Sequence, residues 1–468
     1  MCMKFNPLVY KAYDIRGVFP AQIDAIFSHA LGMAFGTQLI KNGERSVSIG
    51  RDGRISGPDL LKALAQGLLS VGVDVFDIDL CTTPMLYYAA HTITQSGIQI
   101  TGSHNPKDYN GFKMVMGGQA LYGQSIQDLR ELMQQELTPV TQAGTYTACS
   151  IYEEYKSHIV RTVHLERPIR VVIDSGNGVA GAFAPKVFKE LGCEVIELFS
   201  EVDGHFPNHH PDPSKPENLK DLIEAIKTHD AELGFAFDGD GDRLGLVTKT
   251  GENIYPDRQM QLFSKDVLSR VPGGSIVFDV KCSQQLGPYI SSLGGHPVMY
   301  KTGHSLIKAK MKEIDSPLGG EMSGHIFFKE RWFGFDDGTY AGARLLEILS
   351  AVPDGNTLLN QLQDSYSTPE LNIAINDGEA PVLIAQLVQL IQAEGAPSLM
   401  QCPQVTTTDG LRIDWLDGFG LIRGSNTTPV LVLRFEGQSQ DALHRIETDM
   451  LALLRTVMPN AKFTEFQH

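Results

Sequence analysis

The sequence predicts an α/β fold with three topologically related mixed α/β domains and a smaller C-terminal α+β domain. Short apolar runs typical of strands alternate with stretches of helical spacing over most of the chain, which is the signature of a largely parallel sheet. A pattern of strand, turn and helix, in which the strand ends near an aspartate, recurs at 169–174 and 275–280. The chain has 468 residues, and at about 100–200 residues per domain this length predicts two to four domains.

The first predicted domain covers residues 1–150. Strands are expected at 47–49, 73–78 and 97–100, because these runs are apolar or alternate with polar residues. A helix is expected at 58–71, where leucines recur at helical spacing, and another at 125–135, with Ser125 as its candidate N-cap. The polar segment 137–150, rich in Thr, Ala and Gly, is predicted to be a linker.

The other predicted domains cover residues 151–255, 256–367 and 368–468. In the second, a helix and two strands are expected at 152–160, 169–174 and 233–237. In the third, the pattern predicts a strand at 275–280 and a helix at 340–349, with Asp336 and Asp337 as candidate caps. The fourth follows a boundary at 366–370, and its expected helices and strands lie at 382–393, 410–415, 430–435 and 440–454.

The composition excludes several classes of protein. A formal net charge of −16 disfavours nucleic acid and anionic membranes as partners. The six cysteines show no CxxC spacing, so neither a zinc site nor a disulfide framework is predicted. The first residues lack an apolar signal core, and no run approaches the ~20 apolar residues of a membrane helix, so a cytoplasmic location is expected.

The hexapeptide TGSHNP at 101–106 directly follows the strand expected at 97–100. Gly102 permits unusual backbone angles and Pro106 lacks an amide donor, so the strand cannot continue. Ser103 is therefore predicted on a tight loop at the C-terminal end of a strand, where ligands bind in open α/β sheets. Such a serine can be a nucleophile or a phosphate carrier if it is activated. The alternative is that Ser103 and Asn105 merely hydrogen-bond the turn.

A second loop, DGDGDR at 238–243, follows the strand expected at 233–237. Asp238, Asp240 and Asp242 would repel one another without a cation, and their oxygens favour Mg²⁺, Mn²⁺ or Ca²⁺ over zinc. An EF-hand would need Gly at the sixth position and Glu at the twelfth, where this chain has Arg243 and Lys249. The loop therefore predicts a hard-cation site that a phosphate oxygen could complete.

These two loops resemble the phosphoserine and metal-binding loops of the α-D-phosphohexomutases. This family includes phosphoglucomutase, phosphomannomutase, phosphoglucosamine mutase and phosphoacetylglucosamine mutase. GEMSGH at 320–325 resembles the family's sugar-specificity loop, and RGSNTTP at 423–429 resembles the phosphate-binding loop of its last domain. The four motifs occur in the family's order and span most of the chain. The EMS version of the sugar loop is most similar to that of the bacterial bifunctional phosphomannomutase/phosphoglucomutase members.

The resemblance implies four domains around a central cleft and a reversible conversion of hexose 6-phosphate to hexose 1-phosphate, with mannose and glucose as the sugars. It implies a phosphate on Ser103, one Mg²⁺ ion, a reorienting hexose 1,6-bisphosphate intermediate, and glucose 1,6-bisphosphate or mannose 1,6-bisphosphate as activator. It also implies phosphosugar substrates and a place in the synthesis of nucleotide-sugar precursors. A monomer is expected, although the sequence itself carries no signal for the oligomeric state.

The resemblance also assigns residues. An acidic chain must gather cations locally to bind a phosphosugar, and Arg16, Lys113, Arg243, Lys281 and Arg423 are the candidates. Glu321 and Ser323 match the residues that bind the sugar's 3- and 4-hydroxyls. The acid/base group stays open among four side chains, Lys113, His104, His304 and His325. The catalytic candidates are Ser103, His104, Lys113, Arg243, His304 and His325. The metal ligands are Ser103, Asp238, Asp240 and Asp242. The substrate-binding candidates are Tyr13, Arg16, Lys281, His304, Glu321, Ser323, His325, Arg423, Ser425, Asn426 and Thr427.

Three alternatives stay open. Phosphoglucosamine mutase belongs to the same family and would differ in its sugar. A metal-dependent Ser-phosphatase would share Ser103 and the aspartates but would not need the sugar loop or the distal phosphate loop. A non-enzymatic protein that binds a metal or a sugar would carry no covalent phosphate and show no turnover.

Overall fold

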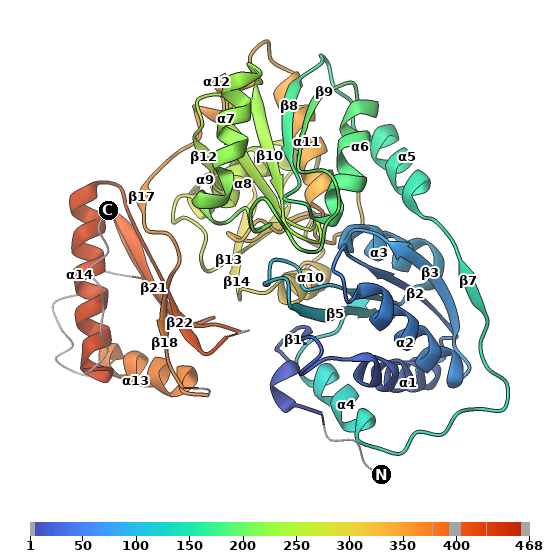
Figure 1. The fold of residues 1–468 in the computed structure, drawn as a ribbon. Helices are drawn as coiled ribbons and strands as arrows, with labels where there is room; N and C mark the ends of the chain where they lie inside the picture. The colour runs from blue at the N-terminus through green and yellow to red at the C-terminus, as the bar shows by residue number, and fades with distance from the viewer. Residues whose placement is uncertain (1–4, 377, 393–403, 427, 460–468) are drawn as a thin grey trace.

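The computed structural model describes residues 5–376, 378–392, 404–426 and 428–459, which form four sheets with flanking helices (Figure 1). The first sheet has the order β1-β5-β4-β2-β3-β7, with β6 beside β5. Its strands are β1 (Ile15–Val18), β2 (Ser46–Arg51), β3 (Asp74–Leu80), β4 (Gly97–Ile100), β5 (Tyr109–Met116), β6 (Gln119–Ala120) and β7 (Tyr146–Ala148). The helices of this unit are α1 (Ala25–Lys41), α2 (Gly57–Ser70), α3 (Thr83–Ala89) and α4 (Gln124–Met133).

The second sheet has the order β12-β11-β10-β8-β9 and the third β14-β13-β15-β16. The second contains β8 (Arg170–Asp174), β9 (Glu194–Leu198), β10 (Leu233–Phe237), β11 (Leu244–Thr248) and β12 (Asn253–Ile254), with α5 (Tyr152–Thr162), α6 (Ala184–Glu190) and α7 (Lys220–Thr228). The third contains β13 (Ser275–Asp279), β14 (His296–Tyr300), β15 (Leu318–Gly320) and β16 (Ile326–Phe328), with α8 (Pro256–Arg270), α9 (Leu286–Ser292), α10 (His304–Glu313), α11 (Gly338–Ser350) and α12 (Asn356–Leu359).

The C-terminal sheet is antiparallel and has the order β17-β22-β21-β20-β19, with β18 beside β22. Its strands are β17 (Tyr366–Ser367), β18 (Leu371–Ala374), β19 (Gln404–Thr406), β20 (Leu411–Trp415), β21 (Gly418–Gly424) and β22 (Val430–Gly437). Helices α13 (Ala380–Gln392) and α14 (Gln440–Val457) pack against it. This unit has an apolar core of its own, whereas the second and third units share one core, to which α3 of the first unit also contributes.

The first three sheets repeat one arrangement of four strands. In each, the first strand pairs in parallel with the second and third, and the third pairs antiparallel with the fourth: β2–β5, β8–β11 and β13–β16. The prediction that the three units have related topology is therefore confirmed. Each of the three sheets contains both parallel and antiparallel strand pairs. The third strands, β4, β10 and β15, are buried along their whole length. Each leads directly into a motif loop and returns through its antiparallel partner.

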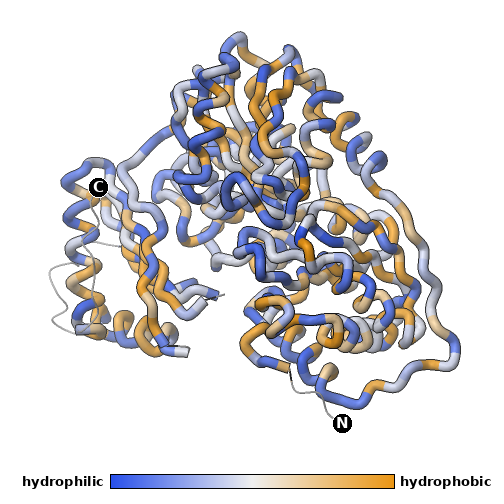
Figure 2. Tube along the Cα trace, viewed as in Figure 1, coloured by the Kyte–Doolittle hydropathy of each residue, from blue (hydrophilic) through white to orange (hydrophobic). Residues whose placement is uncertain are grey.

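Apolar residues gather along these strands and on the helices that cover them, while many connecting loops are hydrophilic (Figure 2). Among the described helices, none is long and apolar enough to cross a membrane. Cys81, Cys149, Cys193 and Cys282, the cysteines within the described segments, are free thiols.

Two local predictions need correction. Ser125 is not the N-cap of its helix: α4 is capped at Gly123, where φ is 56°, and the Ser125 hydroxyl instead bonds back to Tyr122. Asp337 caps α11 by accepting from the amide of Tyr340, but Asp336 does not cap it. The segment predicted as a linker also contributes β7, which pairs in parallel with β3.

Candidate active site

Three of the motif loops meet because they follow equivalent strands. Ser103 Oγ donates to Asp238 Oδ2 at 2.9 Å, which joins the loop after β4 to the loop after β10. The backbones are in close contact, since a Cβ at Gly239 would lie 2.4 Å from the carbonyl oxygen of Ser103. Arg243 forms an isolated β-bridge with His325, and its Nε lies 3.0 Å from His325 Nε2, which joins the loop after β15.

The loop that presents Ser103 is tightly constrained. Ser103 is fully buried and has φ of 48°, a left-handed conformation that is uncommon for a residue with a side chain. Its amide donates to Thr101 Oγ1, whose hydroxyl donates to Asp52 Oδ2, each at 2.7 Å. His104 Nδ1 lies 3.2 Å from Ser103 Oγ. Burial, together with the nearby Arg243 and other cations, holds the pKa of His104 well below its usual range.

The carboxylates of Asp238, Asp240 and Asp242 are fully buried, and each offers an oxygen within 4.8 Å of the others. Burial and mutual repulsion raise the pKa of Asp238 well above its usual range. Burial also opposes ionisation of Asp240, but Lys113 and Thr83 outweigh it and lower the pKa of that carboxyl. Lys113 Nζ lies 2.7 Å from Asp240 Oδ2 and also donates to Asp242.

This cluster fits a divalent cation. Asp240 Oδ1 and Asp242 Oδ1 are buried and find no hydrogen-bond donor among the described residues. Buried anionic oxygens without donors are costly unless a charge compensates them. The donor set consists of oxygens, which hard cations such as Mg²⁺ prefer. Lys113 supplies one compensating charge, and the two remaining oxygens can be satisfied by a metal ion.

His325 is held between two carboxylates. Its Nδ1 lies 2.9 Å from Asp336 Oδ2 and 3.5 Å from Asp242 Oδ1. Asp336 also accepts from Lys308 Nζ at 2.8 Å, and these neighbours overcome burial and keep the pKa of Asp336 well below its usual range. His304 stacks edge-on against Tyr13 and lies near His325, with ring centroids 5.0 and 5.4 Å apart respectively. Burial lowers the pKa of His304.

The sugar-loop residues Glu321 and Ser323 lie together, as their alternation predicts. Ser323 Oγ donates to Glu321 Oε2 at 3.3 Å, and the amide of Gly303 donates to the other carboxylate oxygen. Burial raises the pKa of Glu321, and the nearby His325 opposes that shift.

The distal loop joins the antiparallel strands β21 and β22, and the end of this strand pair that bears the loop faces the first three units (Figure 1). Arg423 Nε donates to Asp409 Oδ2 at 3.0 Å, while its Nη2 is buried and has no hydrogen-bond acceptor within the described segments. Asn426 Nδ2 donates to the carbonyl of Thr302 at 3.0 Å, which links the loop to the third unit. Thr427 lies outside the described residues.

A cavity of about 880 Å³ opens over these loops. Its lining includes six lysine and arginine side chains, Lys11, Arg16, Lys215, Arg243, Lys281 and Arg423. The candidate site residues Tyr13, His104, His304, Glu321, Ser323, His325, Ser425 and Asn426 line it as well. Ser103, Lys113 and the three aspartates are buried next to it. The structure thus brings together all predicted site residues that it describes.

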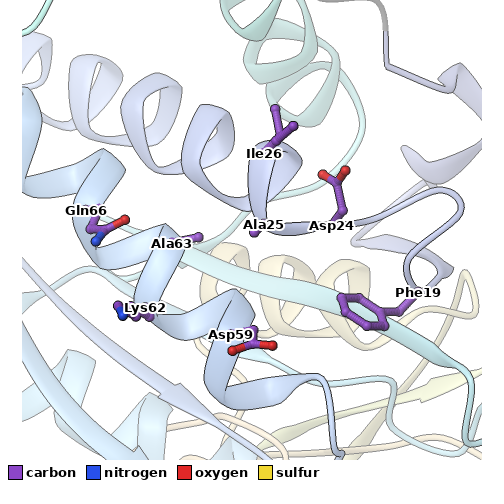
Figure 3. A pocket seen from close by; sticks show the side chains of 8 residues that line it. All are labelled: Phe19, Asp24, Ala25, Ile26, Asp59, Lys62, Ala63 and Gln66. Carbon is purple, nitrogen blue, oxygen red and sulfur yellow. The ribbon is translucent and has the colours of Figure 1, made fainter.

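A separate hollow of about 410 Å³ lies on the first unit between the start of α1 and α2. Figure 3 shows its lining, which includes Phe19, Ile26, Asp59 and Lys62. None of the candidate site residues takes part in it, so it is distinct from the candidate active site.

Sequence reasoning missed several residues of the site. Glu370 accepts from Lys281 Nζ at 2.5 Å, and although burial opposes its ionisation, that lysine lowers its pKa to about 2. Asp336, expected to cap a helix, instead holds His325. Lys11 lines the cavity, and Arg54 donates a hydrogen bond to the carbonyl of Ser103.

Comparisons with known proteins agree with this arrangement. Four phosphoglucomutase/phosphomannomutase family models match in order: alpha/beta/alpha domain I at residues 8–139, domain II at 153–251, domain III at 255–368 and the C-terminal domain at 370–453. A phosphoglucomutase from Neisseria gonorrhoeae is 51% identical over 451 residues, 96% of this chain and 97% of that protein. A phosphomannomutase/phosphoglucomutase from Pseudomonas aeruginosa is 50% identical over 452 residues, 96% of each chain. The crystal structure of a phosphoglucomutase/phosphomannomutase family protein from Burkholderia thailandensis matches with a TM-score of 0.92 and 50% identity, covering 98% of this chain and 99% of that one.

Proposed function

The chain belongs to the phosphoglucomutase/phosphomannomutase family, and we propose that it interconverts hexose 6-phosphate and hexose 1-phosphate through a phosphate carried on Ser103. It is an intramolecular phosphotransferase of carbohydrate metabolism. The observation that carries the site assignment is the meeting of three equivalent strand-end loops. They set Ser103 Oγ 2.9 Å from a buried aspartate cluster, beside a cavity that a fourth, cationic loop also lines.

Asp238, Asp240 and Asp242 would hold Mg²⁺, together with the phosphate on Ser103. When bound, the ion would stabilise the charge that builds on the phosphoryl oxygens during transfer. Arg243 lies 3.8 Å from Asp238 and lines the cavity, so it would contribute a second positive charge there. Burial opposes the positive charge of Lys113, but Asp240 and Asp242 outweigh burial and raise the pKa of the lysine.

In the first half-reaction the free hydroxyl of the bound sugar attacks the phosphorus, and the bond to Ser103 Oγ breaks. Ser103 Oγ leaves as the alkoxide and takes up a proton, while the attacking hydroxyl loses one. His104, 3.2 Å from Ser103 Oγ, and His325, held by Asp336, are the acid/base candidates that the geometry supports, with His304 and Lys113 beside them. The product of this step is a hexose 1,6-bisphosphate.

The bisphosphate must reorient within the cavity before it returns its other phosphate to Ser103. One site has to hold the non-reacting phosphate in both orientations, which suits Lys281 and the loop of Arg423, Ser425, Asn426 and Thr427. Glu321 and Ser323 would bind neighbouring sugar hydroxyls in either direction of the ring. Tyr13 and Arg16 line the same cavity between these loops.

The substrate range tests this function. We expect comparable turnover of mannose and glucose phosphates, because their 3- and 4-hydroxyls are oriented alike and the two sugars differ only at carbon 2. Glucosamine phosphates should turn over at least about tenfold more slowly, because a protonated amino group adds a like charge to a cavity lined by lysine and arginine. Coupled assays with each 1-phosphate and catalytic glucose 1,6-bisphosphate measure the ratio.

Galactose 1-phosphate is the matched control, since only its 4-hydroxyl is inverted relative to glucose and it should react poorly. Turnover of glucosamine 6-phosphate equal to that of glucose would favour the phosphoglucosamine mutase alternative. Steady release of inorganic phosphate, with no need for bisphosphate, would favour the Ser-phosphatase alternative.

The distal loop gives a second expectation. Arg423→Ala should lower kcat/KM by about one to two decades, because a charge-assisted contact to phosphate is worth roughly 1.5–3 kcal/mol. The variant should also release more bisphosphate into solution, while Ser103 remains phosphorylated. Steady-state kinetics and quantification of free bisphosphate measure both effects.

Arg445→Ala is the matched control for this variant. Arg445 lies on α14 of the same domain, is paired with Asp417 at 2.6 Å and does not line the cavity. Its loss should leave kcat/KM unchanged. If Arg423→Ala also leaves kcat/KM and bisphosphate release unchanged, the distal loop is only a turn.

A further inference from the structure

Arg54 makes an unusual set of contacts beneath the serine loop. It lies between β2 and α2, and its side chain is fully buried. Nη1 donates to the carbonyls of Pro106 and Tyr109, at 2.6 and 2.8 Å. Nη2 donates to the carbonyls of Ser103 and Asn105, at 2.9 and 2.6 Å. One guanidinium thus satisfies three backbone carbonyls of the loop between β4 and β5 and a fourth at the first residue of β5.

These contacts match the chemistry of arginine. Buried carbonyls need donors, and the planar guanidinium carries five N–H groups in a fixed fork, which lysine cannot reproduce. The guanidinium also lies against the backbone of Gly102, where a Cβ would be 2.4 Å from Arg54 Cζ. The residue before Ser103 must therefore be glycine for Arg54 to keep its place.

Arg54 is itself held from two sides. Asp52 accepts from the amide of Arg54 at 2.9 Å, lies 3.3 Å from its Nε, and accepts from Thr101, whose hydroxyl oxygen receives the amide of Ser103. From the second unit, the ring of Phe206 faces the guanidinium, with its centroid 5.4 Å from Cζ. The guanidinium is thus fixed between the two units that carry Ser103 and the aspartates.

We propose that Arg54 is the positioning residue of the phosphoserine loop. It fixes the left-handed turn at Ser103, so that Oγ points at Asp238 and the metal-binding loop. Arg54 is fully buried and does not line the cavity, so a sugar bound in the cavity would not reach it and it acts on transfer only through Ser103. This inference rests on the proposed function, because it assigns Arg54 a part in the phosphoryl transfer to and from Ser103.

Two substitutions disturb the guanidinium in different ways. Arg54→Lys keeps the charge but loses the fork of donors. Gly102→Ala keeps Arg54, but the added Cβ must displace the guanidinium, which is the movable end of a side chain. Each should lower kcat by about 100-fold, the loss expected when a reacting group is misplaced by about 1 Å. KM for the hexose phosphate should stay within about twofold, since neither substitution replaces a residue that lines the cavity.

Because both changes act on the same guanidinium, the double variant should be no slower than about the slower single variant. The rate at which glucose 1,6-bisphosphate phosphorylates Ser103, followed by intact mass, should fall by the same factor as kcat. Arg344→Lys is the control: Arg344 is also fully buried and donates to the Glu330 carbonyl and to carboxylates, but it lies away from the cavity. It should lower the melting temperature and leave kcat unchanged.

The inference is overturned if folded Arg54→Lys or Gly102→Ala keeps the wild-type kcat. It is also overturned if the two losses multiply in the double variant, or if Arg344→Lys loses as much kcat. If Arg54→Lys does not fold, comparing kcat of Gly102→Ala with kcat of Arg344→Lys is sufficient to test the inference. A wild-type protein that is never phosphorylated would instead refute the proposed function.

Discussion

Replacing Ser103 with alanine is expected to remove the covalent phosphate and to lower mutase turnover by several decades. The buried Oγ donates to Asp238 at 2.9 Å, and alanine has no hydroxyl that could carry the phosphate there. Losing a catalytic nucleophile costs on the order of 10⁴–10⁶-fold in kcat. The measurement is kcat with saturating glucose 1,6-bisphosphate, together with the melting temperature to confirm folding.

Ser175→Ala is the matched control. Like Ser103, Ser175 is buried at the end of a strand, in this case β8. It makes no hydrogen bond to the three aspartates. It should retain turnover near that of the wild type. Substantial mutase activity in Ser103→Ala would remove Ser103 from the mechanism.

Removing the metal should have the second largest effect. Chelation is expected to lower turnover by about 10³-fold, because the dication stabilises phosphoryl charge and an electrostatic group of this kind is worth several kcal/mol. Asp240→Asn should keep the fold and weaken Mg²⁺ binding, because one of three buried carboxylates loses its charge. Titration of the chelated protein with Mg²⁺, followed by turnover and by calorimetry, measures both effects.

Asp266→Asn is the control for this substitution. Asp266 lies on α8, pairs with Arg344 and Arg270, and does not line the cavity. It should leave the Mg²⁺ titration unchanged. Full turnover after chelation, or zinc as the ion that supports activity, would contradict the assignment of a hard-cation site.

The sequence predicts the motif loops well because each motif ends a strand by its own local chemistry. Gly102 and Pro106 interrupt an apolar run, and the alternating aspartates after 233–237 need a cation wherever they lie. From the sequence, the three units could be recognised as related only by their repeated order of strand, turn and helix, because the sequence identity between them is slight. The pairing of the four strands could not be predicted. Its consequence, that β4, β10 and β15 deliver their loops to one place, depends on how the three sheets pack.

Residues that act through distant partners were not predictable. Asp336 and Asp337 are adjacent and either could cap α11, but the backbone gives the cap to Asp337 and turns Asp336 toward His325. Glu370 stands in a stretch predicted only as a boundary, and its importance depends on Lys281, 89 positions away. The sequence around Arg54 is typical of a solvated loop. That its guanidinium donates to four backbone carbonyls near Ser103 is visible only in the folded structure.

The central claim is that Ser103 carries the phosphoryl group that the enzyme exchanges with its substrate. Intact-mass measurement of the wild-type protein, before and after incubation with glucose 1,6-bisphosphate and then with excess glucose 1-phosphate, tests it most directly. The account predicts the gain of one phosphoryl group, mapped to the peptide that contains Ser103, and its loss or exchange when the monophosphate is added. A turning-over enzyme that gains no phosphate, or that carries it on a different residue, would contradict the account.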